Sequence, residues 1–331
     1  MIKVEHLTKY YGDFLAVSDL SFEIEEGHVY GFLGPNGAGK TTTMNIMTGC
    51  LSATSGRVEV GGHDIFEETG QAKKLIGYLP EQPPLYMNET PAEYLRFVGE
   101  AKGLKGEELR TQVEKVIRQV RIEAVRDRRI SALSKGYKQR VGIAQALLGN
   151  PKVIILDEPT VGLDPIQIIE IRDLIRQLGQ EHTVILSSHI LSEVQAICEN
   201  ILIIAHGKLV AFDTPDKLER SLLSANEITF TTDTKSDVVR GLLGKVDHLT
   251  DVELEKREDG LLSARLKTDS KDIYAVSRQL FFAFAEEDQP LLELNLKKAS
   301  LEDIFIELTE SGGEDQNGDG TPPEESEAEA V

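Results

Sequence analysis

Two short stretches of this chain combine residue types that can do chemistry on a phosphate group. The first, Gly34–Thr41, reads GPNGAGKT and fits the pattern G-x-x-x-x-G-K-[ST], known as Walker A. Its glycines let backbone N–H groups close around a β-phosphate, while Lys40 reaches the β- and γ-phosphates. The Thr41 hydroxyl suits Mg²⁺, and Thr42 comes next for the α-phosphate. The predicted phosphate-binding residues are Gly34, Asn36, Gly37, Ala38, Gly39, Lys40, Thr41 and Thr42.

The second stretch, Val153–Pro159, is an apolar run that ends abruptly in two carboxylates, Asp157 and Glu158. A strand buried on both faces of a parallel sheet has this composition. Ligands of open α/β sheets bind at the carboxyl ends of the strands, where Asp157 suits the Mg²⁺ shell and Glu158 suits a general base for water. Acids at the end of a strand can also serve solubility alone, but the Walker A pattern upstream favours the chemical interpretation.

The elements that must position these residues are readable from the apolar pattern. Val29–Leu33 predicts a short buried strand before the glycine-rich loop, and Lys40–Cys50 predicts the helix after it. Leu75–Leu79 predicts a strand that leads to Gln82, and Thr183–Leu186 predicts another that leads to His189. A strand, a phosphate loop and a helix in this order indicate an α/β fold.

With these pieces together, the chain resembles the ATP-binding subunits of ATP-binding-cassette (ABC) transporters over roughly residues 1 to 215. The family signature L-S-G-G-Q is matched by Leu133–Tyr137, LSKGY, and the Walker B motif by VIILDE. Gln82 matches the Q-loop, Gly162-Leu163-Asp164 the D-loop and His189 the switch histidine. The signature departs from the commonest form at Lys135 and Tyr137, which concerns the rate of hydrolysis rather than the family.

The resemblance implies an ATPase with ATP and Mg²⁺ as its cofactors. It implies that Glu158, His189 and Gln82 carry the hydrolysis, and that Thr41, Gln82 and Asp157 hold the metal. The family uses Ser134 and Gly136 against the γ-phosphate and Asp164 in the D-loop. An aromatic residue that stacks on adenine corresponds best to Tyr11, with Tyr10 as the alternative.

The resemblance also implies two partners. In this family, two ATP-binding domains face head to tail, so each ATP lies between the Walker A of one copy and the signature of another. Because Lys40, Ser134, Glu158 and His189 all match, a homodimer is expected, although a related second subunit stays open. A separate integral membrane permease is the other partner, and the loop Pro83–Pro91 is its expected docking site. The chain is then expected to lie on the cytoplasmic face of the membrane, and export is favoured over import.

Composition narrows the possible partners. The formal net charge is −20, from 36 basic and 56 acidic residues. Proteins that bind nucleic acids usually carry a basic surface, so no nucleic-acid partner is expected. The first residues have no apolar signal core, and no apolar run has the ~18 to 20 residues needed to cross a bilayer. Cys50 and Cys198 match no metal spacing and are expected to be reduced thiols.

The expected fold is a P-loop ABC ATPase domain over residues 1–220, with a RecA-like core, an antiparallel β subdomain and a helical subdomain. A helical apolar stripe between Gln82 and the signature is expected to face a core; it consists of Leu109, Val113, Val116, Ile117 and Val120. The apolar periodicity of residues 221–310 predicts strands and helices in the order β-α-β-β-α-β, followed by a closing helix from Ser300. This order indicates a ferredoxin-like α+β accessory domain. Residues 311–331 are expected to form a disordered acidic tail. The role of the accessory domain, whether regulatory, dimer-stabilising or passive, stays open.

Two other function classes remain to be weighed. Soluble ABC ATPases that act on ribosomes or DNA carry two cassettes or a long coiled coil, and this sequence has neither. A module that senses ATP without hydrolysing it would not need the intact Glu158 and His189. The sequence therefore favours the transporter ATPase.

Overall fold

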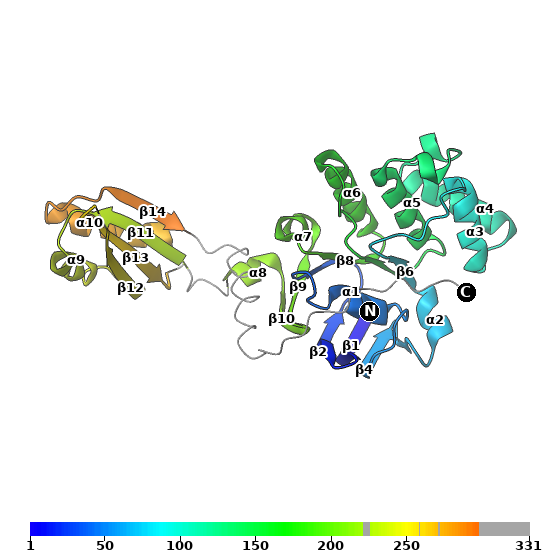
Figure 1. Ribbon diagram of the computed structural model, residues 1–331, viewed down its shortest axis with the longest axis horizontal. Coiled ribbons are helices and arrows are strands. Elements are labelled where there is room, and N and C mark those ends of the chain that lie inside the picture. The colour runs from blue at the N-terminus through cyan, green and yellow to red at the C-terminus, as the bar shows by residue number, and fades with distance from the viewer. Residues whose placement is uncertain (221–225, 258, 271, 298–331) are drawn as a thin grey trace. The chain divides into compact units, whose positions relative to one another are not determined.

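The computed structural model describes residues 1–220, 226–257, 259–270 and 272–297 (Figure 1). The chain divides into two compact units, the first over Met1–Asp213 and the second within Thr214–Glu307. The division falls at the start of α8 (Pro215–Arg220), whereas we expected the boundary at its end. No helix of the described residues is long and apolar enough to cross a membrane.

The first unit is built on a six-stranded sheet in the order β10-β9-β3-β8-β7-β6. The pairings β9–β3, β3–β8, β8–β7 and β7–β6 are parallel, whereas β10 runs antiparallel to β9. Strands β3 and β7 are buried at every residue, which explains why both read as continuous apolar runs. The bounds are β3 Val29–Leu33, β6 Ile76–Leu79, β7 Val153–Leu156, β8 Thr183–Ser188, β9 Asn200–Ala205 and β10 Lys208–Asp213.

A second, antiparallel sheet has the order β2-β1-β4-β5. Helix α1 (Lys40–Met47) shares one apolar core with both sheets, which joins Val4 and Leu20 to Met44 and Phe32. The phosphate loop is therefore held between two sheets. The strands are β1 Ile2–Tyr11, β2 Phe14–Ile24, β4 Ser55–Val60 and β5 His63–Asp64, and helix α2 Thr69–Lys74 follows them.

Three helices, α3 (Pro91–Ala101), α4 (Gly106–Gln119) and α5 (Lys135–Leu147), form the helical subdomain (Figure 1). Two 3₁₀ turns, Glu123–Val125 and Ile130–Ala132, lead to the signature. Helix α3 begins with a capping box between Thr90 and Glu93. The predicted apolar stripe of α4 is buried at every position and thus confirmed as core. Helices α6 (Pro165–Leu178) and α7 (Leu191–Ile197) complete the first unit.

In the described residues of the second unit, α8 is followed by a four-stranded antiparallel sheet in the order β12-β13-β11-β14, which shares a core with helices α9 and α10. Its core includes the edge-to-face pair Phe230 and Phe284. Order and connectivity confirm the ferredoxin-like expectation. The elements are β11 Asn226–Thr232, α9 Ser236–Leu243, β12 Leu249–Lys256, β13 Leu262–Thr268, α10 Ile273–Glu286 and β14 Glu293–Lys297. The predicted helix from Ser300 and the acidic tail lie outside the described residues.

Candidate functional site

The phosphate loop is shaped by glycines at positive φ. Gly37 has φ 78° and Gly39 has φ 99°, backbone conformations that residues with a Cβ atom rarely adopt. Gly39 is the N-cap of α1, no side chain caps the helix, and no acidic residue lies in its first turn. The N-terminal N–H groups of α1 therefore keep their capacity to bind an anion. Gly34 has a different role, since a Cβ there would lie 2.3 Å from the carbonyl oxygen of Ile204.

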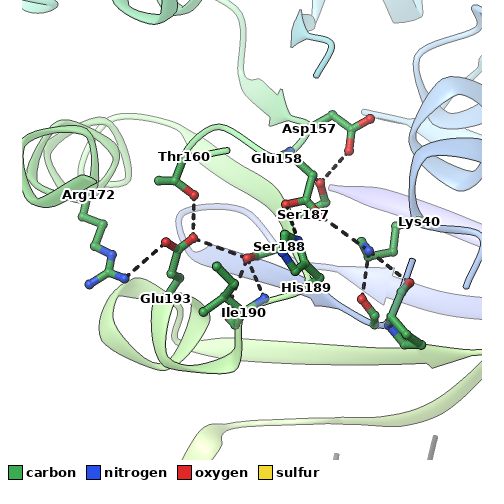
Figure 2. Close-up of polar contacts among 12 residues, drawn as sticks. Lys40, Asp157, Glu158, Thr160, Arg172, Ser187, Ser188, His189, Ile190 and Glu193 are labelled. Atoms are coloured by element: carbon green, nitrogen blue, oxygen red, sulfur yellow. Dashed lines mark hydrogen bonds and ion pairs between the residues drawn. The ribbon is translucent and has the colours of Figure 1, made fainter. Parts of the chain in front are cut away.

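Lys40 is the buried cation of the loop. Its Nζ donates hydrogen bonds to the carbonyl oxygens of Gly34 at 2.8 Å and Pro35 at 3.2 Å. It also lies 3.5 Å from a carboxylate oxygen of Glu158, and both side chains are buried (Figure 2). The loop thus holds its own lysine beside the Walker B carboxylate, and the bonds to neutral carbonyls are ones that an anionic phosphate can replace.

The end of β7 is tied to the end of β8 by Ser187. The Ser187 hydroxyl donates to Asp157 Oδ1 at 2.5 Å and accepts from the Glu158 N–H at 2.7 Å. Glu158 itself has φ 46°, a strained conformation for a residue other than glycine. Because its amide is held by Ser187, the strained backbone that aims the Glu158 side chain is fixed from the neighbouring strand.

Glu158 and His189 form a pair across the two strand ends. His189 Nδ1 lies 3.0 Å from Glu158 Oε2. The Glu158 side chain is buried, whereas His189 is 40% exposed at its side chain. The carboxylate therefore has Lys40 on one oxygen and His189 on the other, and the histidine faces the open side where a nucleotide can enter.

These residues surround a cavity of about 500 Å³. Most predicted ATP-binding residues line it, as do the predicted pair Glu158 and His189. Gln82 is exposed in the turn after β6, and its neighbour Glu81 lines the cavity in its place. The full lining is Tyr11, Phe14, Ala16, Asn36, Gly37, Ala38, Gly39, Lys40, Thr41, Thr42, Glu81, Glu158, Val161 and His189.

The rim of the cavity carries two aromatic side chains. Tyr11 lines it, as expected, whereas its neighbour Tyr10 is not among the lining residues. Phe14, which the sequence reasoning missed, faces Tyr11 across the β1–β2 hairpin. The signal was present in the sequence, because an aromatic residue stands on either side of the turn Gly12-Asp13.

Ser134 and Gly136 lie elsewhere, in a second cavity of about 210 Å³ together with Tyr137 and Gln167. Ser134 caps α5. Asp164 caps α6 by accepting from the Gln167 N–H at 2.9 Å, and it lines neither cavity. Within one chain, therefore, the signature does not reach the phosphate loop.

Lys135, at which the signature departs from its commonest form, lies close to Gly162 of the D-loop. A Cβ on Gly162 would lie 2.1 Å from Lys135 Nζ, the end of a flexible side chain. Gly162 also has φ 67°, a backbone conformation that favours glycine.

The predicted metal ligands are Thr41, Gln82 and Asp157. Asp157 is completely buried, and its Oδ2 has no hydrogen-bond partner. Thr41 lines the cavity, whereas Asp157 and Gln82 do not. An orphaned carboxylate oxygen at the end of β7 fits a divalent cation, and Mg²⁺ typically takes one or two carboxylates together with substrate phosphates and water. Among the described residues, no group of three or more His, Cys, Asp and Glu side chains could hold a metal ion.

The two cysteines take no part in this site. Cys50 is exposed and Cys198 is buried, and both are free thiols. Burial raises the pKa of the Cys198 thiol, which makes it unreactive. The expectation of reduced thiols agrees with this arrangement.

Comparison with known proteins identifies the family. The family model described as ABC transporter matches residues 17–161. The bacitracin transport ATP-binding protein BcrA of Bacillus licheniformis is 34% identical over 317 residues, covering 94% of this chain and 98% of that protein. The linearmycin resistance ATP-binding protein LnrL of Bacillus subtilis is 33% identical over 312 residues, covering 93% and 98%.

Solved structures agree. An ATP-binding subunit of an ABC transporter has a TM-score of 0.61 at 29% identity, covering 67% of this chain and 93% of that one. A dimeric ATP-binding cassette in a post-hydrolysis state, bound to ADP and Pi, has a TM-score of 0.59 at 26% identity, covering 65% and 98%. Together with the phosphate loop and the paired strand ends, these matches show that the chain belongs to the ABC transporter family as an ATP-binding subunit and is an ATPase.

Proposed function

We propose that this chain is the ATP-hydrolysing subunit of an exporter and that it drives a separate integral membrane permease from the cytoplasmic face of the membrane. The two full-length relatives support this, since their names refer to bacitracin transport and linearmycin resistance. The observation that carries the proposal is the arrangement of Lys40, Glu158 and His189 around one cavity while the signature lies in another. A complete ATP site, with a phosphate loop and a signature on the same ATP, then requires two copies of the chain.

The second copy is proposed to be identical. Each ATP would lie between the phosphate loop of one copy and Ser134 and Gly136 of the other. Ser134 is exposed at the N-terminus of α5, so its hydroxyl and the helix end are accessible to a partner's phosphate. Loss of the γ-phosphate removes the anion that joins the copies, which lets them separate. Because one chain carries both halves of the site, a homodimer has two competent sites.

Hydrolysis then needs positioning and neutralisation of charge. Lys40 and the N-terminus of α1 bind the phosphates of ATP, and Tyr11 and Phe14 flank its adenine ring. Glu158 accepts a proton from water, and His189, held by Glu158 at 3.0 Å, contacts the γ-phosphate. Mg²⁺, held by Thr41, Asp157 and Gln82, supplies charge neutralisation at the phosphates when bound.

An aromatic patch supports the site proposed for the permease. Tyr86 is 51% exposed and Phe97 is 50% exposed, and their rings are 5.3 Å apart. Met87 beside them is also exposed, whereas Leu85 is half-buried. A soluble surface seldom gathers such side chains without a partner. Leu85, Tyr86 and Met87 of the patch closely follow Gln82 in the sequence, which connects the proposed docking site to the Q-loop.

The domain division belongs to the same proposal: residues 1–220 bind and hydrolyse ATP, residues 221–310 form an accessory domain, and residues 311–331 form an acidic tail. The role of the accessory domain is not assigned.

Substitution of the general base tests the hydrolysis mechanism. Glu158→Gln keeps the size of the side chain but removes the carboxylate that accepts a proton. We expect turnover to fall on the order of a hundredfold or more and an ATP-bound dimer to accumulate, measured by phosphate release and light scattering. Unchanged turnover would show that Glu158 is not the base. A hydrolase that never dimerised with ATP would contradict the two-copy site.

Substitutions in the aromatic patch test the permease proposal. Tyr86→Asp places a charge in the patch, and Phe66→Asp is a matched control because Phe66 is 41% exposed in the antiparallel subdomain. We expect Tyr86→Asp, alone or with Leu85→Ser, to abolish co-purification of a multispanning membrane protein from detergent-solubilised cells while leaving basal ATPase activity intact. Equal recovery with both variants would remove the patch as the docking site. Recovery of ribosomal proteins instead would favour a soluble ABC ATPase.

A further inference from the structure

A buried carboxylate behind the nucleotide cavity has no role in the site described so far. Glu193 lies on α7, two residues into the helix, and only 4% of its surface is exposed. It does not line the cavity. A buried carboxylate is costly unless it is paired and hydrogen-bonded, so its partners should indicate why the chain keeps it there.

One oxygen of Glu193 joins the two strand ends that carry the active pair (Figure 2). Glu193 Oε2 accepts from Thr160 Oγ1 at 2.5 Å and from Ser188 Oγ at 3.4 Å. Thr160 is two residues after Glu158, and Ser188 directly precedes His189. A single carboxylate oxygen therefore fixes the backbone beside both members of the Glu158–His189 pair.

Ser188 also restrains the backbone on the far side of the histidine. Its hydroxyl accepts from the Ile190 N–H at 3.0 Å, so residues 188 and 190 form a turn that encloses His189. The same hydroxyl lies 3.4 Å from Glu193 Oε2 and 3.5 Å from the Ile190 carbonyl oxygen, and its single proton serves one of these two acceptors. Donation to Glu193 leaves the lone pairs of the hydroxyl to accept from the Ile190 N–H, which links the carboxylate to the turn around His189.

The other oxygen of Glu193 reaches a third element. Glu193 Oε1 lies 3.5 Å from an Nη atom of Arg172 on α6, the helix that begins after Asp164 of the D-loop. Arg172 Nε is buried without a hydrogen-bond partner. The carboxylate therefore connects the Walker B turn, the turn of His189 and the helix of the D-loop.

We infer that Glu193 is a positioning residue for hydrolysis: through Thr160 and Ser188 it holds Glu158 and His189 at the 3.0 Å separation seen in the structure. Ser187 ties the same strand ends through Asp157 and the Glu158 N–H, and Glu193 ties them through Thr160 and Ser188. Without Glu193, the two turns lose their common acceptor, and the pair is free to drift apart. This role rests on the hydrolytic roles proposed above for Glu158 and His189, and it is independent of the direction of transport.

Steady-state ATPase measurements on the full chain test this role. Glu193→Met, which removes both acceptor oxygens, and Thr160→Val are each expected to lower kcat on the order of tenfold or more, because each breaks the hydrogen bond between the two side chains and small displacements of reacting groups are costly. KM for ATP should stay within about twofold, since Glu193 and Thr160 do not line the cavity. Thr160→Ser keeps the hydroxyl and should retain kcat. The double variant Glu193→Met/Thr160→Val should lose no more kcat than the single variant with the larger loss, since both changes break one connection.

Asp64→Leu is the matched control. Asp64 is a buried carboxylate with an arginine partner, Arg57 at 2.9 Å, in the antiparallel subdomain away from the strand ends of β7 and β8. The kcat of this variant should stay near that of the wild type even if its melting temperature falls. Equal kcat losses in Asp64→Leu and Glu193→Met, or additive losses in the double variant, would reduce Glu193 to a structural role. If Glu193→Met does not fold, the Thr160→Val and Thr160→Ser pair decides, and full kcat in Thr160→Val overturns the inference.

Discussion

The buried Asp157 is expected to lower the stability of the protein without nucleotide, although it is a proposed metal ligand. Its carboxylate is completely buried, with Ser187 bonded to Oδ1 and no partner at Oδ2. In the nucleotide-free protein, this arrangement carries the cost of an unpartnered buried charge. Asp157→Asn keeps an oxygen to accept from Ser187 and removes that charge. We therefore expect the substitution to stabilise the nucleotide-free protein.

An unsatisfied buried neutral group costs about 1–3 kcal/mol, and a charged one costs more. The amide group of asparagine also lacks a partner at that position, so only the difference between the charged and the neutral group is gained, on the order of 1–2 kcal/mol. For a unit of this size, each kcal/mol raises the melting temperature by about 2–4 °C. The further rise that wild-type protein shows with ATP and Mg²⁺ should be largely lost, because the substitution removes a proposed metal ligand.

Asp64→Asn gives the opposite expectation and serves as the control. Asp64 Oδ1 accepts from the N–H groups of Phe66 and Glu67, and Oδ2 accepts from Arg57. These bonds lower the pKa of Asp64, so its charge is stabilising above the ordinary pKa of an aspartate. Differential scanning fluorimetry with and without ATP and Mg²⁺ measures both variants. If Asp157→Asn destabilised the nucleotide-free protein as Asp64→Asn does, the reasoning from the orphaned oxygen would be refuted.

Two further predictions follow from the contacts. Ser187→Ala removes the donor to Asp157 and the acceptor of the Glu158 N–H. We expect the free energy of unfolding, measured in urea, to fall by about 2 kcal/mol or more, and kcat to fall as well. An unchanged kcat would show that Ser187 does not orient Glu158. Lys102 donates to the carbonyl oxygens of Gln145, Ala146 and Leu148 at the end of α5, and burial lowers its pKa to about 8. Since the unfolded lysine holds its proton to higher pH than the folded one, the stability of wild type relative to Lys102→Met should rise between about pH 8 and pH 10; a flat difference in urea unfolding across that range would contradict the lowered pKa.

Much of the architecture could be predicted because it rests on local patterns. The apolar run Val29–Leu33 before a glycine-rich loop predicts β3 with its observed bounds. The order of the second unit followed from strand and helix periodicity in the same way. The apolar stripe of α4 was assigned to a core correctly because a helical period of apolar residues requires a partner surface.

The details of the site were less predictable. Phe14 and Val161 on the cavity wall carry no motif, and Glu81 lines the cavity where Gln82 was expected. Gly34, a predicted residue of the phosphate cradle, is also constrained by the close approach of the Ile204 carbonyl oxygen, which no local pattern indicates. These facts depend on which segments distant in sequence come within a few ångströms of each other.

The residue types and their order along the chain are enough to predict the available chemistry: a lysine in a flexible loop, two carboxylates after a buried strand and a histidine after another. How these groups are held depends on contacts between segments that are distant in the sequence. Ser187 and Glu193 belong to no local pattern around Glu158, yet Ser187 accepts from the Glu158 N–H and Glu193 accepts from the hydroxyl of Thr160, two residues further on. The physical reason is that parallel strands bring together residues separated by a whole helix, and hydrogen bonds between their ends depend on that register.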